Sequence, residues 1–404
     1  MTIPANVIEL TDLVARWIHV IAGIMWIGNS MLFNWLDRNL HPSARLEGEG
    51  STLGEIWLLH SGGFYFVEKT LLAGQPLPRP LHWFKWQAYT TWLSGMALLV
   101  VVYYLGGRAV LADPTVAPLT HAQAMLMGLG AIAGGWAIYE AMQRFVAPHA
   151  PRAAAAVWVA ALTAISIALT RLLNGRAAFL HVGAMLGTIM AANVFFTIIP
   201  SQRELVAMVS QGRGGDADVS ARAKRVSIHN NYFTFPVIVL MMSNHFPSIY
   251  GNSRSWLLLL VLIASGAAVR HVLNIRFSYP SWKPALAGTM LASVAMLYMV
   301  LVPAAPNANA SLSSIPERVS FADARHVIDR RCAVCHSAQP ADLTFGVAPA
   351  GVMFDTPAEI AARVLRIRER AIVTRTMPPA NKTNITDGER ALLARWIEQG
   401  AVIP

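Results

Sequence analysis

Long apolar stretches are the feature of this sequence that most restricts its fold. A helix that crosses the hydrocarbon core of a bilayer needs about 20 mostly apolar residues. About eight stretches meet this need, at 13–36, 84–106, 121–142, 153–172, 177–199, 233–250, 255–273 and 284–303. With 55% hydrophobic and only 13% charged residues, the chain is too apolar for an ordinary soluble enzyme. The sequence therefore predicts an all-α fold whose main part is a polytopic bundle of about eight transmembrane helices in a lipid bilayer.

The segment at 53–72 is apolar but does not fit a plain membrane helix. It carries Glu55, His60, Lys69 and a Gly-Gly pair, and charged groups are costly in hydrocarbon. We therefore expect a re-entrant or interfacial segment there.

Basic residues predict the orientation of the bundle. Eight spans place both ends of the membrane unit on one side, and roughly three times as many Lys and Arg residues fall in loops on the other side. The positive-inside rule then places residues 1 and 304 outside the cytoplasm, on the periplasmic side of a bacterial inner (plasma) membrane. The net charge of +10 reflects this topology, so we expect no nucleic-acid partner.

The composition of the chain changes after the last apolar stretch. "AAPNANASLSSIPE" is rich in Ala, Pro, Asn and Ser and has no apolar periodicity, which is typical of a linker. The polar segment that follows predicts a small soluble domain. We therefore expect a membrane domain at 1–303, a linker at 304–318 and a soluble α-helical domain at 319–404.

The only two cysteines of the chain, Cys332 and Cys335, lie in the motif "CAVCH" with His336. In C-x-x-C-H, the two thiols form thioether bonds to haem and the histidine is the proximal iron ligand. The alternatives are a redox dithiol and half of a zinc site, but zinc needs further ligands at matching spacing, and a thioredoxin-like motif needs a βαβ pattern. The motif therefore predicts one covalent haem c.

A methionine is commonly the sixth ligand of an electron-transfer haem c. Met377, in "TRTMPPANK", is followed by two prolines that keep the chain extended. Met353 is the rival, and we expect it to pack on the haem. His336 and Met377 are thus the predicted axial ligands, as in the small class I cytochromes c that this domain resembles. Such domains have crossing terminal helices, here expected at 319–331 and 386–399, the latter with a Thr386/Glu389 capping box.

Histidines of the membrane unit fall at two depths in the predicted topology. His19, His181 and His245 lie toward the outer ends of their spans, whereas His229 and His271 lie near the inner face. The outer three are candidate ligands of a haem b or polar groups of a pocket. The alternative is that each one bonds a neighbouring helix or lies among lipid headgroups.

The densest polar segment of the membrane unit is "SIHNNYFTFPVIVLMMSNHFP", residues 227–247. Its amides offer donors and acceptors to a polar heterocycle, or they join helices through hydrogen bonds. The sequence leaves both roles open.

These features together resemble the membrane-bound urate oxidases with a C-terminal cytochrome c, the PuuD family. The resemblance rests on "WIHVIAGIMWIGNSMLFNWL", "HNNYFTFPVIVLMMSNH", "CAVCH" and "TMPP" and covers essentially the whole chain. It implies an oxidoreductase of purine catabolism that oxidises urate to 5-hydroxyisourate. Electrons would pass through haem c to a downstream acceptor of the respiratory chain.

Under this resemblance, residues 229–245 supply the candidate site. The catalytic candidates are His229, Tyr232 and His245, with an imidazole as the base. The substrate-binding candidates are Asn230, Asn231 and Asn244.

Two other functions remain open. The first is a general quinol or electron-transfer membrane cytochrome of b/c type without urate chemistry. The second is a transporter whose fused cytochrome serves regulation or anchoring.

Overall fold

The structure is a computed structural model that describes residues 5–42, 51–72, 76–105, 108–213, 216–301, 318–342 and 347–403. Helices make up 72% of the residues that the structure describes, so among them the predicted all-α architecture holds apart from one β-hairpin. The predicted linker lies outside the described residues up to residue 317, as do residues 302–303 at the end of the last apolar stretch.

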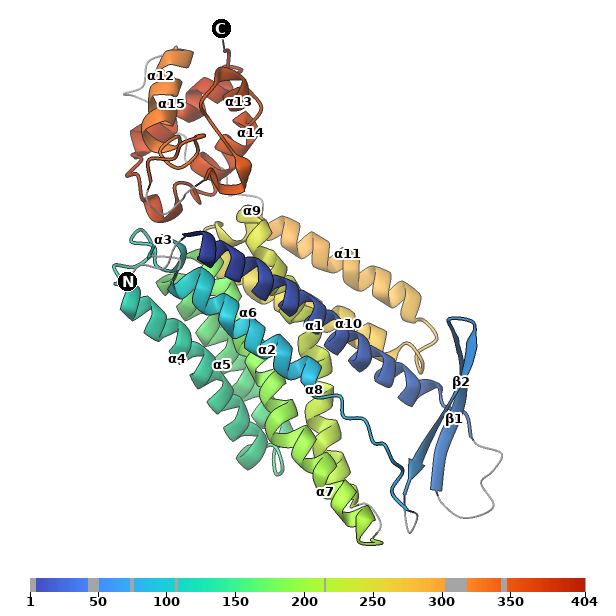
Figure 1. Cartoon of the computed structure of the whole chain (residues 1–404). Helices are drawn as coiled ribbons and strands as arrows, with labels where there is room; N and C mark the ends of the chain where they lie inside the picture. The colour runs from blue at the N-terminus through green and yellow to red at the C-terminus, as the bar shows by residue number, and fades with distance from the viewer. Residues whose placement is uncertain are drawn as a thin grey trace.

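The membrane unit is a bundle of long helices that run beside one another (Figure 1). Its α-helices are α1 (Ala5–Asn39), α2 (Trp86–Leu99), α3 (Arg108–Leu111), α4 (His121–Ala141), α5 (Pro151–Leu172), α6 (Gly175–Ala192), α7 (Ile199–Ser210), α8 (Ala217–Met242), α9 (Pro247–Tyr250), α10 (Ser255–Ile275) and α11 (Trp282–Leu301). Three π-helical turns extend α2, α4 and α6, namely η1 (Val100–Tyr104), η2 (Met142–Val146) and η3 (Asn193–Ile198).

Six helices within the described ranges are long and apolar enough to cross a membrane: Val7–Asn39, His121–Val146, Pro151–Leu172, Gly175–Ser210, Ser255–Ile275 and Trp282–Leu301. The two further stretches that the sequence predicts as spans are helical as well, in α2 and α8. Both are more polar: α2 contains Gln87, Thr90 and Thr91, and α8 begins with a charged turn and continues through His229 and two asparagines. The number eight therefore stays a prediction.

The segment expected to be re-entrant or interfacial forms a β-hairpin. Strand β1 (Ser51–His60) pairs antiparallel with β2 (Gly63–Leu71), at the end of α1 (Figure 1). Ser61 and Gly62 both have positive φ, as a two-residue hairpin turn requires. The strands are rich in aromatic and β-branched residues, which favour pleated structure. Trp57 and Phe66 pair across them with ring centroids 4.9 Å apart.

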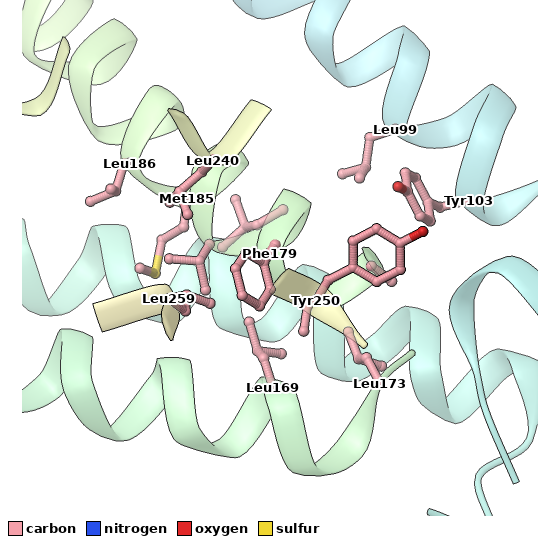
Figure 2. Packing of buried hydrophobic residues seen from close by; sticks show 14 of the residues in the cluster. Leu99, Tyr103, Leu169, Leu173, Phe179, Met185, Leu186, Leu240, Tyr250 and Leu259 are labelled. Atoms are coloured by element: carbon pink, nitrogen blue, oxygen red, sulfur yellow. The ribbon is translucent and has the colours of Figure 1, made fainter. Parts of the chain in front are cut away.

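The core of the bundle lies around α6. Its small and medium-sized residues let the neighbouring helices approach closely, and Phe179, Met185 and Leu186 are fully buried (Figure 2). A Cβ added to Gly135 of α4 would stand 2.2 Å from Met185 Sδ, so this contact requires glycine.

The C-terminal unit, here residues 318–342 and 347–403, is a second set of helices. It contains α12 (Phe321–Arg331), α13 (Pro357–Ala361), α14 (Val364–Ile367), the π-helical turn η7 (Arg368–Val373) and α15 (Asp387–Glu398). The two terminal helices occur where the sequence predicted them, and they pack on each other with Phe321 and Trp396 6.0 Å apart. The Thr386/Glu389 capping box is formed, and Gly400 follows α15 with φ of 91°, as a helix C-terminus favours.

An ion pair joins these two helices and predicts a pH dependence. Arg331 Nε lies 2.9 Å from Glu389 Oε1. Burial alone would raise the pKa of Glu389, but hydrogen bonds from the Thr386 N–H and from Arg331 outweigh it, so the net pKa is lowered. Because the folded pKa is below the unfolded one, this stabilisation is complete above pH 4.5 and is lost as the pH falls through the folded pKa.

We therefore expect Glu389→Gln to lower the melting temperature of the C-terminal unit at neutral pH and to weaken the loss of stability in acid. Near-UV circular dichroism melts of the full-length protein between about pH 7 and pH 3 measure this. Glu398→Gln, at the exposed far end of the same helix, is the control. Equal acid sensitivity of Glu389→Gln and the unchanged protein would contradict the assignment.

Candidate functional site

The C-terminal unit lies on one end of the helical bundle, next to α3 and α9 (Figure 1). We call this end the docked end. A Cβ added to Gly251 would stand 2.4 Å from Thr376 Cγ2 and 3.0 Å from Thr374 Cβ. Arg370 of η7 reaches Tyr250 of α9. The loop before Met377 is therefore packed directly on the membrane unit.

The C-x-x-C-H motif forms a helical turn at the end of α12. The His336 N–H donates to the Cys332 carbonyl over 3.0 Å, which brings the two thiols and the imidazole to one turn. His336 Nδ1 donates to the Val352 carbonyl over 2.9 Å, which leaves Nε2 for a metal. Burial lowers the pKa of His336, so its ring is neutral, as a ligand requires.

Cys332 and Cys335 both lie on this turn and are not joined to each other. Burial is the main cause that raises the pKa of each thiol. Two cysteines on one turn with an adjacent imidazole are the groups that covalent haem attachment needs, and these residues therefore fit haem c.

The two candidate methionines lie in different surroundings. Met377 is held by its backbone, since its N–H donates to the Arg370 carbonyl and its carbonyl accepts from Arg390 Nη1, each over 3.0 Å. Met353 lies between Val352 and Phe354, which bond the ring and the carbonyl of His336. Met353 therefore lies in the segment that bonds His336.

No cluster of three or more His, Cys, Asp or Glu suited to a metal ion occurs within the described ranges. A haem c takes only one imidazole and one thioether from the chain as iron ligands, so this absence does not bear on the predicted haem c.

The first polar group inside the bundle surrounds Tyr139, and we call it the Tyr139 group. The Tyr139 hydroxyl lies 2.7 Å from His229 Nδ1 and accepts from Asn193 Nδ2 over 3.1 Å. Asn193 also donates to Asn230 Oδ1 over 2.8 Å, and Asn230 donates to the Met190 carbonyl over 2.9 Å. These bonds join α4, the α6–η3 helix and α8.

A second polar group lies on another face of α8, and we call it the Arg270 group. Asn231 Oδ1 accepts from Arg270 Nε over 2.9 Å and from Asn274 Nδ2 over 2.7 Å. Phe235 lies 5.4 Å from the guanidinium. Tyr232, nearby, pairs with His271 Nδ1 over 2.7 Å. These bonds join α8 to α10.

The other two residues predicted from this segment lie at the far end of α8. Asn244 and the exposed His245 follow α8 in a short turn, η4 (Ser243–His245). Thirteen helical residues, about 20 Å at 1.5 Å each, separate His229 from the last residue of α8. One small substrate therefore does not contact both His229 and His245.

The outer histidines of the prediction lie in separate places. His19 Nδ1 lies 2.9 Å from the Thr91 carbonyl of α2. His181 is fully buried; its Nδ1 donates to the Ala177 carbonyl over 2.7 Å and its Nε2 lies 3.1 Å from the Tyr104 hydroxyl. A Cβ on Gly128 would stand 2.5 Å from that Nε2. With both nitrogens bonded and helix backbone against the ring, His181 does not fit as a haem b ligand.

His181 instead belongs to a cluster of aromatic and basic side chains at the docked end. We call it the Tyr103 cluster, and it consists of Tyr103, Tyr104, His121, Arg176, His181 and Tyr250. Arg176 lies close to Tyr103, and Tyr250 interacts with both of them. Figure 2 shows the Tyr103 and Tyr250 rings beside each other.

A family comparison identifies the membrane unit. Residues 5–302 match the family model described as urate oxidase N-terminal. The chain belongs to this urate oxidase family. No curated protein and no solved structure matches the chain in corresponding searches.

Membership of the urate oxidase family confirms the resemblance seen in the sequence for the membrane unit. All the helices from α1 to α11 lie within the matched residues, as do both polar groups and the Tyr103 cluster. The match ends before α12, so the cytochrome assignment rests on the motif and its geometry.

The tyrosines and the arginine of the Tyr103 cluster were missed by the sequence analysis of this urate oxidase-family chain. Tyr103 and Tyr250 end apolar stretches, and Arg176 stands directly before one. The only signal was an arginine close to an apolar stretch on the side assigned to the periplasm, where basic residues are few.

Proposed function

We propose that this urate oxidase-family protein oxidises urate to 5-hydroxyisourate in the membrane and passes the electrons through a C-terminal haem c. A downstream carrier of the respiratory chain would then accept them. The observation that supports this most is the packing of the Met377 loop on the end of the family-matched bundle, at Gly251 and Tyr250. A donor site and a one-electron acceptor site are thereby in contact within one chain.

The chemistry requires two electrons to leave one substrate. Urate loses two electrons and two protons and gains one water, which supplies the added hydroxyl of 5-hydroxyisourate. When bound, haem c supplies one-electron redox chemistry. The chain would hold it through Cys332 and Cys335, with His336 and Met377 as axial ligands. Met377 is favoured over Met353 because the residues on either side of Met353, Val352 and Phe354, already bond His336.

Arg370 connects the two parts of this proposal. Its carbonyl accepts from the Met377 N–H, its charge acts on His336, and its side chain reaches Tyr250. Arg370 would therefore hold the Met377 loop against the bundle, without contacting the reacting atoms of urate.

The predicted roles on α8 divide by position. His229, Asn230, Asn231 and Tyr232 bond neighbouring helices, so we assign them to holding the helices together. Asn244 and His245 lie at the other end of α8, on the side of α9 and the docked end, so they remain candidates for contact with the substrate. The Oδ1 of Asn244 is buried and has no hydrogen-bond partner within the described ranges.

The proposal includes the topology. We infer eight spans, with α2 and α8 as the two polar ones, in a bacterial inner membrane. The N-terminus and the C-terminal unit would be periplasmic. The distribution of charge supports this: α7 and the start of α8 lie far from the docked end (Figure 1), and they carry Arg203, Arg222, Lys224 and Arg225, as cytoplasmic ends do.

The experiment is anaerobic reduction of the oxidised, purified holoprotein by urate, followed by haem absorption. We expect two haems to be reduced per urate, since each haem takes one electron. Ascorbate gives the total reducible haem as a control. Reduction by a quinol together with no reduction by urate would instead establish a general electron-transfer cytochrome.

A further inference from the structure

We infer that the Tyr103 cluster binds the urate anion, with Arg176, Tyr103 and His121 as the side chains that hold it. This inference rests on the proposed function and names its substrate site.

Three polar atoms of the cluster are buried and make no well-formed hydrogen bond within the described ranges: the Tyr103 hydroxyl, His121 Nδ1 and Arg176 Nε. The Tyr103 hydroxyl lies close enough to the Arg176 guanidinium for the two to interact, but without the geometry of a full hydrogen bond. A buried polar atom without a good hydrogen bond is costly, so each needs an explanation in a native structure. Arg176 neighbours Tyr103 and His121 contacts the backbone of the next residue, Tyr104, which points to a ligand that completes these atoms.

The rest of the cluster holds these atoms in position. His121 Nε2 lies 2.9 Å from the Tyr104 carbonyl, so its ring orientation is set while Nδ1 stays available. Tyr104 in turn bonds His181, and the Tyr103 ring packs on His181 with centroids 5.8 Å apart. The three groups therefore come from different helices, η1, α4 and α6, and are fixed by packing.

The donor set suits a purine anion. Arg176 makes no ion pair with a described Asp or Glu, so its charge is uncompensated. A guanidinium presents planar, parallel donors to an anionic oxygen or nitrogen pair. The Tyr103 hydroxyl can donate to a ring carbonyl. His121 Nε2 donates to the Tyr104 carbonyl, so Nδ1 of the neutral ring can accept from a ring N–H. Urate offers all of these partners.

The position of the cluster fits transfer of electrons to the C-terminal unit. Tyr250 interacts with Arg176 on the bundle side and with Arg370 on the other, and Arg370 bonds Met377. The path from the anion site to the predicted haem ligands therefore passes only through neighbouring residues.

The Arg270 group is the rival anion site, because it too contains a buried arginine. Its guanidinium already bonds Asn231 and packs on Phe235. It also lies fifteen residues beyond the first residue of α10, about 22 Å along the helix, whereas Arg176 is the second residue of α6. The three buried atoms and the short path both favour Arg176.

The test is equilibrium dialysis of radiolabelled urate against full-length holoprotein kept fully reduced under anaerobic conditions, so that bound urate is not consumed. We expect Arg176→Gln to raise the Kd at least about tenfold, which corresponds to the loss of one charged contact. Arg176→Lys keeps the charge, and its Kd is expected to lie between those of the unchanged protein and Arg176→Gln. Arg171→Gln removes an exposed arginine at the same end of the bundle and is expected to leave the Kd unchanged.

Tyr103→Phe separates binding from folding. It removes a hydroxyl that makes no well-formed hydrogen bond among the described residues and has only Arg176 beside it, so we expect a melting temperature close to that of the unchanged protein. Under the inference, the same variant binds urate several-fold more weakly, a loss that a purely structural tyrosine would not show.

The outcomes are distinct. If the unchanged protein does not bind urate, the proposed function fails together with the inference. If the unchanged protein binds urate and both Arg176→Gln and Tyr103→Phe bind it equally well, the inference is overturned while the function stands. A loss of urate binding in Arg270→Gln alone would place the anion in the Arg270 group, and this result would also overturn the inference.

Discussion

Replacing both Cys332 and Cys335 by serine is expected to remove covalent haem and to bring urate-dependent reduction of an external acceptor down to the background rate. Serine keeps the shape of the turn that ends α12, but a hydroxyl does not form the thioether bond. The two thiols are the only cysteines in the chain, so no other residue replaces them. Haem staining after denaturing electrophoresis measures attachment, and acceptor reduction by urate measures turnover.

Two further variants make this result specific. Val334→Ala changes the residue between the cysteines and leaves both thiols, so it is expected to retain haem and turnover. His336→Ala is expected to keep the covalent haem and to lose the ligand field of the proximal imidazole, which shifts the visible spectrum. Full urate turnover in the double serine variant would contradict the proposed electron path.

Local signals in the sequence predicted local structure well. The terminal helices of the C-terminal unit and the Thr386/Glu389 capping box were expected and are present, because each depends on residues within one or two turns. Family membership could be predicted for the same reason, since the quoted segments are continuous.

The hairpin at 51–71 is a structure that the sequence analysis did not specify. Charges and glycines in an apolar stretch indicated a re-entrant or interfacial segment, which stays a prediction, but the aromatic and β-branched residues around the Ser61–Gly62 turn also favour a hairpin. The turn, with two residues of positive φ, decides the structure.

The arrangement of the polar residues could not be predicted, because it depends on helix packing. His229, Asn230 and Asn231 are consecutive, yet they point to different neighbouring helices. Their spacing of about 100° per residue around a helix has this effect. Conversely, Tyr103, His121 and Arg176 are far apart in the sequence. They lie near one another because η1 ends, and α4 and α6 begin, at the docked end.

Close contact between the two units predicts that Gly251→Val slows electron transfer without preventing urate binding. A Cβ at this position would meet Thr376 and Thr374, and both lie in the loop that leads to Met377. The backbone of Gly251 has a φ of −89°, which valine tolerates. The Cβ would stand 2.4 Å from Thr376 Cγ2 and 2.8 Å from the Pro247 carbonyl oxygen of α9, so both the contact with the loop and the end of α9 must shift. The added methyl groups would displace the C-terminal unit from α9.

The measurement is single-turnover haem reduction by urate in a stopped-flow instrument without oxygen. Because a displacement of about 1 Å can cost on the order of 10²-fold in a geometry-dependent step, we expect a slowing of that size. Urate affinity of the reduced protein is expected to be unchanged. Gly288→Val adds the same group to α11, at a glycine whose Cβ would meet nothing within 4 Å, and is expected to leave the rate unaltered. Equal rates for Gly251→Val and Gly288→Val would show that electrons leave the bundle by a route other than the docked loop, since only the first variant changes that contact.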